Sequence, residues 1–206
     1  MLPRMKFLIV LIAFTVVLKL LSYAIKFYDV QVDPDVIFYP WNFMPLTALC
    51  LYSGAYVTDR RWSIGLPLLT VLISDLGIWA LTGRFSSGFP IDCWSVFLSY
   101  VLIIVMGHGL NRRTWPARAV DALARGLLAE TLFFLVTNFA YFLIQTVHPQ
   151  TLAGLIDCYV VAIPFAKTSF VSTAFYSVLL FSPLALHAAG EESPNTKPEL
   201  QTALSQ

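Results

Sequence analysis

The stretch LLTVLISDLGIWAL, residues 68–81, places a single aspartate, Asp75, in the middle of an otherwise uncharged and mostly apolar run. A charge at the centre of a membrane helix costs about 2.5–3.5 kcal/mol on insertion scales. Charged side chains inside membranes therefore normally face the interior of a helix bundle and find a partner there. The stretch predicts a membrane helix whose aspartate points towards a polar centre.

The composition of the whole chain also indicates a membrane protein. Of its 206 residues, 58% are hydrophobic and 12% are charged, and the mean hydropathy is +0.73. Soluble domains are typically about 45–50% apolar and about 25% charged. The formal net charge is +1 and no basic run is present, so we expect the lipid bilayer as a partner and no nucleic acid.

Six apolar segments have the length and the lack of alternation that membrane helices require. We predict helices at roughly 6–27, 43–58, 63–83, 94–110, 119–145 and 157–182. A span needs about 20 residues to cross about 30 Å of hydrocarbon, so the second and fourth segments are short. The predicted fold is an all-α integral membrane protein: one compact bundle of six transmembrane helices at 1–186 and a disordered cytoplasmic tail at 187–206.

Basic residues alternate between the predicted loops. They precede the first helix and recur at 60–61 and 112–118, whereas 28–41 and 146–156 contain none and 84–93 contains only Arg84. The positive-inside rule then places both termini in the cytoplasm of a multi-pass protein of the cell (cytoplasmic) membrane. The three outward loops are rich in aromatic residues and proline, a composition suited to covering a small ligand.

Counting residues along the predicted helices places Lys19, Asp75, Asn138 and Lys167 at a similar depth in the outer half of the membrane. We expect Asp75 to pair with Lys167 or Lys19, with Asn138 and Thr137 completing the hydrogen bonds. Two interpretations remain open. The polar groups either fix the helix register, with Lys19 extending towards the headgroups, or form the floor of a cavity that opens to the outside.

Helices five and six carry further polar signals. Thr151 is a suitable N-cap for a short surface helix through Leu155 that leads into helix six, and Pro164 is expected to bend that helix. Asp121 and Arg125 have the i, i+4 spacing of a local ion pair. Arg125 and Glu130, in the inner half of helix five, are interpreted as structural or partner contacts.

The order of WNFMPLTALCLYSGAYVTDRR, PLLTVLISDLG, FFLVTNFAYF and TLAGLIDCYVVAIPF resembles a family of uncharacterised bacterial six-helix membrane proteins. That family is similar to the substrate-binding S components of energy-coupling-factor (ECF) vitamin transporters, and the resemblance covers roughly residues 38–182. It implies a vitamin-like solute in an outward-facing pocket and an ECF-type energising module as a partner. The resemblance and the polar residues predicted at a similar depth together give the expected substrate-binding residues: Asn42, Asp75, Thr137, Asn138, Tyr159, Lys167 and Lys19.

Uptake of a small solute is thus the predicted function. The first helix lacks the alanine pair, four residues apart, through which S components commonly dock, so a solitary or proton-coupled carrier using Asp75 is the alternative. A membrane enzyme is disfavoured, because Ser74 and Asp75 project about 100° apart on a helix, and a purely structural protein is the remaining possibility. We expect no cofactor and no metal site; Cys93 and Cys158 are free, paired or ligands.

Overall fold

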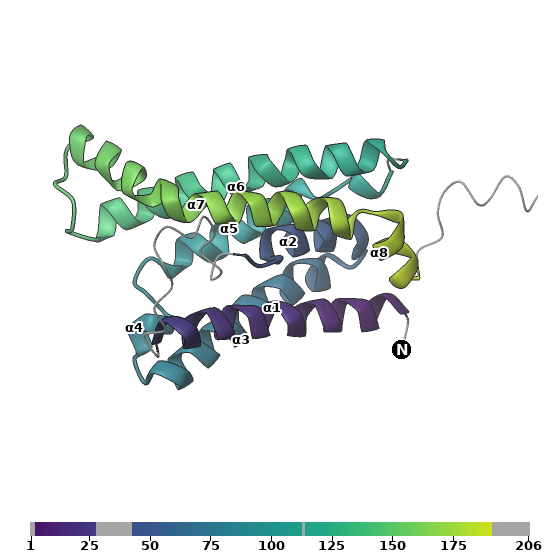
Figure 1. Cartoon of the computed structure of the whole chain (residues 1–206), viewed down its shortest axis with the longest axis horizontal. Helices are drawn as coiled ribbons and strands as arrows, with labels where there is room; N and C mark the ends of the chain where they lie inside the picture. The colour runs from purple at the N-terminus through teal and green to yellow at the C-terminus, as the bar shows by residue number, and fades with distance from the viewer. Residues whose placement is uncertain (1–2, 28–42, 113, 191–206) are drawn as a thin grey trace, which may run out of the picture.

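The computed structural model describes residues 3–27, 43–112 and 114–190, and within these ranges it is helical with no strand. Figure 1 shows the helices side by side along one axis. Their bounds are α1 Pro3–Phe27, α2 Leu46–Tyr56, α3 Arg60–Thr82, α4 Phe85–Gly88, α5 Cys93–Met106, the 3-10 turn η2 Leu110–Arg112, α6 Ala117–Ile144, α7 Leu152–Leu180 and α8 Pro183–Ala188.

Five segments of the described chain are long and apolar enough to cross a membrane. They are Lys6–Ile25, Arg60–Thr82, Phe85–Met106, Ala117–Ile144 and Leu152–Leu180. The protein is therefore a multi-pass helical membrane protein. The expected sixth span, at 43–58, is represented by α2, which has only 11 residues. At 1.5 Å per residue α2 is about 16 Å long, roughly half of the hydrocarbon thickness, so six full spans are not confirmed.

The helices run back and forth along the bundle, so that the predicted loops alternate between its two ends. In Figure 1, α1 and α3 form one side of the bundle, α6 and α7 form the other, and α2 and α5 lie between them. The start of α1 lies at the same end as α8, while α4 and the connection between α6 and α7 lie at the opposite end. Which end faces the cytoplasm stays a prediction from the basic residues.

The centre of the bundle is built on direct backbone contact between α2 and α5. Every residue of α2 is buried. A Cβ atom added to Gly54 would overlap the carbonyl oxygen of Ile104, and one added to Gly107 would overlap the carbonyl oxygen of Leu51. Small residues that allow such close approach are a common means of joining helices in membranes, where apolar side chains gain little by leaving lipid.

Polar groups at the helix ends also bear out sequence predictions. The Arg125 guanidinium donates to the carbonyl oxygens of Met106 and His108, 2.8 and 2.9 Å away, where α5 ends. The same side chain pairs with Asp121 at 3.1 Å, which confirms the predicted i, i+4 ion pair. These contacts tie the start of α6 to the end of α5.

The beginning of α7 departs from the prediction in one respect. The Thr151 side chain accepts a hydrogen bond from the Gly154 N–H at 3.2 Å, which confirms the predicted N-cap. The expected separate surface helix is wrong, because α7 is continuous from Leu152 and runs through Pro164. Figure 1 shows that α7 bends along its length. At the other end of α7, α8 crosses the predicted tail boundary at residue 187, and tail residues 191–206 lie outside the described chain.

Candidate functional site

The aspartate of the opening stretch pairs with a lysine from the first helix. Lys19 Nζ of α1 donates to Asp75 Oδ1 of α3 at 2.6 Å. The two side chains are only 16% and 11% exposed, respectively. Of the two partners expected for Asp75, the structure therefore brings Lys19 to it, and the ion pair joins α1 to α3.

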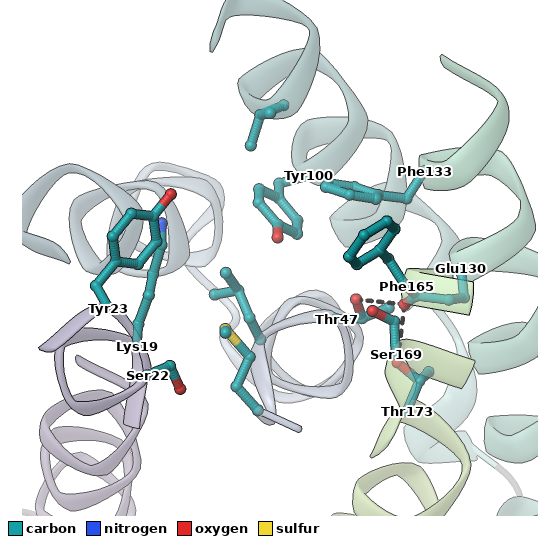
Figure 2. Close-up of a pocket in the computed structure, with 13 residues that line it drawn as sticks. Lys19, Ser22, Tyr23, Thr47, Tyr100, Glu130, Phe133, Phe165, Ser169 and Thr173 are labelled. Carbon is teal, nitrogen blue, oxygen red and sulfur yellow. Dashed lines mark hydrogen bonds between the residues drawn. The ribbon is translucent and has the colours of Figure 1, made fainter. Parts of the chain in front are cut away.

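Lys19 also lines a cavity inside the bundle, shown in Figure 2. The cavity has a volume of about 440 Å³ and lies between α1, α2, α5, α6 and α7. Small-molecule sites typically measure about 300–1,000 Å³ and combine apolar walls with a few placed polar groups. This cavity has that composition, because hydroxyl, ammonium and carboxyl groups alternate with aromatic rings around it.

Glu130 of α6 provides the second charged group of the cavity wall. The residue is 5% exposed, and its Oε2 accepts from the hydroxyls of Thr47 at 2.9 Å and Thr173 at 2.8 Å. These bonds connect α6 to α2 and α7, as the dashed lines in Figure 2 show. Among the described residues, no lysine or arginine forms an ion pair with Glu130. The carboxyl group is thus held by neutral donors.

Aromatic side chains form the wall between the two charged groups. The rings of Tyr100 and Phe133 have centroids 5.1 Å apart, and Phe165 lies beside Glu130 in Figure 2. Tyr100 stands between the Lys19 side and the Glu130 side with its hydroxyl directed into the space. The cavity wall therefore has the ammonium group of Lys19 at one end, the carboxyl group of Glu130 at the other and aromatic rings between them.

Thr137 and Asn138 lie next to this cavity rather than in it. They line a smaller pocket of about 210 Å³ that shares Glu130 and Phe133 with the cavity. The Thr137 hydroxyl donates to Phe133 O and the Asn138 amide to Phe134 O, each at 2.8 Å and four residues back along α6. The expected hydrogen bonds from these side chains to Asp75 are therefore not formed.

Lys167, Tyr159 and Asn42 complete the set of expected residues. Lys167 is exposed and lines a separate, mainly apolar pocket of about 550 Å³. It follows Phe165 by two positions, which turns it about 200° around α7, away from the cavity-facing side. Tyr159 donates to Leu135 O at 2.8 Å, which joins α7 to α6 away from the cavity. Asn42 lies outside the described residues.

Glu130 is the residue whose place at the cavity sequence reasoning missed. Its predicted role as a structural contact is confirmed by the bonds from Thr47 and Thr173, but its position in the cavity wall was not predicted. The signal was present: Glu130 interrupts an apolar helix in the same way as Asp75 does. Which side of α6 faces a cavity is set by the neighbouring helices and could not be counted along the chain.

The cysteines add no metal chemistry to the described part of the chain. Cys50, Cys93 and Cys158 are free thiols. No group of three or more His, Cys, Asp or Glu side chains in residues 3–27, 43–112 and 114–190 is arranged to hold a metal ion. The polar groups that line the cavity are lysine, carboxyl and hydroxyl groups.

Fold and site together define a multi-pass helical membrane protein with a polar and aromatic cavity inside its bundle. The chain belongs to a family of unknown function, DUF6580, whose sequence model matches residues 1–195. Comparisons with curated proteins and with solved structures gave no match. The function is therefore argued from the cavity itself.

Proposed function

We propose that this protein binds a small, vitamin-like solute in the cavity between α1, α2, α5, α6 and α7 and carries it into the cell, as ECF S components do. The observation that carries the proposal is the position of Lys19 and Glu130 in the wall of one cavity within a membrane bundle. Ionisable side chains at membrane depth are expensive, and they typically mark the path or the binding site of a solute.

The short helix α2 supports a binding role for the same place. Its first residues, Leu46 and Thr47, line the cavity, so the helix begins where the solute would sit. Transporters commonly build their sites near the middle of the membrane from helices that stop or start there, because backbone groups at such ends can meet the ligand. A helix of 11 residues that starts at a cavity fits this pattern.

The source of energy distinguishes two forms of the proposal. The sequence contains no Walker motif, so an ATP-driven form requires ATPase subunits on another chain, which an ECF-type energising module would provide. A proton-coupled or solitary carrier is the second candidate. It is favoured by the acidic Glu130, which has no basic partner among the described residues and adds a second buried carboxyl group to Asp75.

Filling the cavity tests the proposal directly. The protein is purified in mild detergent, co-purifying solutes are identified by native mass spectrometry, and uptake of an identified solute is measured in cells. Ser169→Phe places a ring in the cavity and should remove both co-purification and uptake. Val171→Phe introduces the same ring at an exposed position of α7 that does not line this cavity, and it should change neither.

The outcomes separate the alternatives. Equal binding and uptake by both variants would contradict a role for the cavity. If Ser169→Phe alone loses the solute, the proposal stands, and a protonophore then distinguishes the two energy sources. Uptake that stops with the proton gradient supports the carrier, and uptake that continues supports the ATP-driven form.

A further inference from the structure

We propose that the solute is a small organic cation, with its positive group against Glu130 and its apolar body against Tyr100, Phe133 and Phe165. This inference rests on the proposed function and names the class of substrate. It follows from three features of the cavity: the balance of charge in its wall, the free acceptor on Glu130 and the aromatic side chains that lie between the charged groups.

The first feature is the balance of charge. Lys19 and Asp75 neutralise each other at 2.6 Å, which leaves Glu130 as the one described carboxyl group at the cavity without a basic partner. Placing an uncompensated charge inside a membrane bundle is costly, and such groups normally pair. A cationic solute would supply the missing partner when it binds. The ion pair would then contribute to the free energy of binding and not to the stability of the protein without a solute.

The second feature is the geometry of the carboxyl group. Thr47 and Thr173 both donate to Oε2 of Glu130. Oε1 accepts no hydrogen bond from the described residues, so it can receive an N–H of a protonated amine. The two hydroxyls hold the carboxyl group in place, which lowers the cost of ordering it when the solute binds.

The third feature is the aromatic wall. Cations bind over aromatic faces at about 6 Å or less from the ring centroid, and several rings around one position form a cage for ammonium groups. Tyr100 and Phe133 lie with centroids 5.1 Å apart, and Figure 2 shows Phe165 next to Glu130. The rings thus lie where the body and the positive group of a solute bound at Glu130 would extend.

The same features select against other ligands. An anion would have to compete with Asp75 for Lys19. It would also be repelled by the Glu130 carboxylate in the same cavity, and such repulsion against the wrong ligand contributes to specificity. A hard metal ion requires several oxygen ligands, typically six or more for calcium. The wall next to Glu130 offers hydroxyls and aromatic rings instead. An organic cation is the class that matches the whole wall.

The experiment uses three probes with a common phenyl body and different charge: 2-phenylethylammonium, 2-phenylethanol and 3-phenylpropanoate. Binding to the full chain in detergent is measured by calorimetry at pH 7. The ammonium should bind at least about tenfold more tightly than the alcohol, and the propanoate should bind most weakly. Glu130→Gln keeps an acceptor for Thr47 and Thr173 and should reduce the ammonium to the affinity of the alcohol.

Two further variants make the result specific. Phe133→Leu keeps all charges and should weaken ammonium binding about three- to tenfold, which is the size of a cation–π contact. Asp121→Asn removes a carboxylate on the same helix that pairs with Arg125 and does not line the cavity, so it should leave all three affinities unchanged. Phe133→Leu also provides a test if Glu130→Gln does not fold.

Several results would overturn the assignment. They are equal binding of the three probes, no binding of any probe, or an ammonium preference that survives Glu130→Gln. A neutral or anionic solute that co-purifies and is transported would overturn the cation while leaving the proposed function intact. Loss of uptake in Ser169→Phe together with a preference for the ammonium supports both.

Discussion

The two sides of the cavity handle buried charge in different ways. On one side, Lys19 of α1 and Asp75 of α3 form an ion pair at 2.6 Å, in which the two charges neutralise each other. On the side formed by α2, α6 and α7, Glu130 is held by the hydroxyls of Thr47 and Thr173, which position the carboxyl group without neutralising it. The first arrangement joins two helices through an ion pair, whereas the second leaves a carboxyl group without a basic partner among the described residues, which is the group we propose for ligand binding.

This difference sets the expected cost of each substitution. Removing one member of a buried ion pair leaves the other charge uncompensated, which is among the most destabilising single changes. Removing a carboxyl group that is held by hydroxyls leaves neutral donors without an acceptor, which costs less. The stability of variants on the two sides should therefore fall in a definite order.

The largest effect is expected for Asp75→Ala. It leaves the Lys19 ammonium buried without its partner and should lower the free energy of unfolding by about 3–5 kcal/mol. The double variant Lys19→Met, Asp75→Leu replaces both charges with apolar groups and should recover most of this loss. Denaturant unfolding in detergent micelles measures both. A double variant as unstable as Asp75→Ala would show that the loss does not come from the unpaired Lys19 charge, and an Asp75→Ala variant as stable as the wild type would show that the pair does not stabilise the fold.

A smaller effect is expected at Glu130. Glu130→Ala removes the acceptor for both threonine hydroxyls and should destabilise the protein by about 1–3 kcal/mol. Glu130→Gln retains an acceptor and removes the charge, so its change should stay below about 1 kcal/mol. The same unfolding assay compares the two. If Gln is as damaging as Ala, the charge itself stabilises the fold, and the contrast between the two sides of the cavity is lost.

The smallest effect is expected for the threonines that hold Glu130. Thr173→Val keeps the shape and removes one of the two hydroxyl bonds to Oε2, which should cost about 1 kcal/mol. Thr137→Val is the matched control, because its hydroxyl bonds only to a carbonyl of its own helix. Thermal unfolding should shift more for Thr173→Val than for Thr137→Val, and equal shifts would assign no special role to the bond with Glu130.

Much of this architecture follows from the pattern of the sequence. Uninterrupted apolar length predicted the long helices, and the cost of an isolated charge predicted that Asp75 has a basic partner. Local rules predicted the Thr151 cap and the Asp121–Arg125 pair, because both depend only on residues within one turn. These predictions needed no knowledge of how the helices pack.

The remaining features depend on packing and could not be counted along the chain. Counting residues along a helix predicts the depth of a side chain in the membrane but not the direction in which it points. The count placed Lys167 at the depth of Asp75, whereas in the structure Lys167 is exposed and lines a different pocket. The rotation of a helix is set by its neighbours. Hydropathy likewise marked an apolar segment at 43–58 but not that its regular helix would be limited to 11 residues. Glu130 interrupts an apolar helix as Asp75 does, but the sequence does not show that its side of α6 faces a cavity.

The backbone contact between α2 and α5 limits how the cavity can open. With main-chain atoms touching at Gly54 and Gly107, neither helix can slide along the other without a collision. Thr47 on α2 and Tyr100 on α5 both line the cavity, and this contact holds the two helices that carry them against each other. If the cavity takes up a solute as proposed, we therefore expect it to open by movement of α1, α6 or α7 rather than by sliding of α2 along α5.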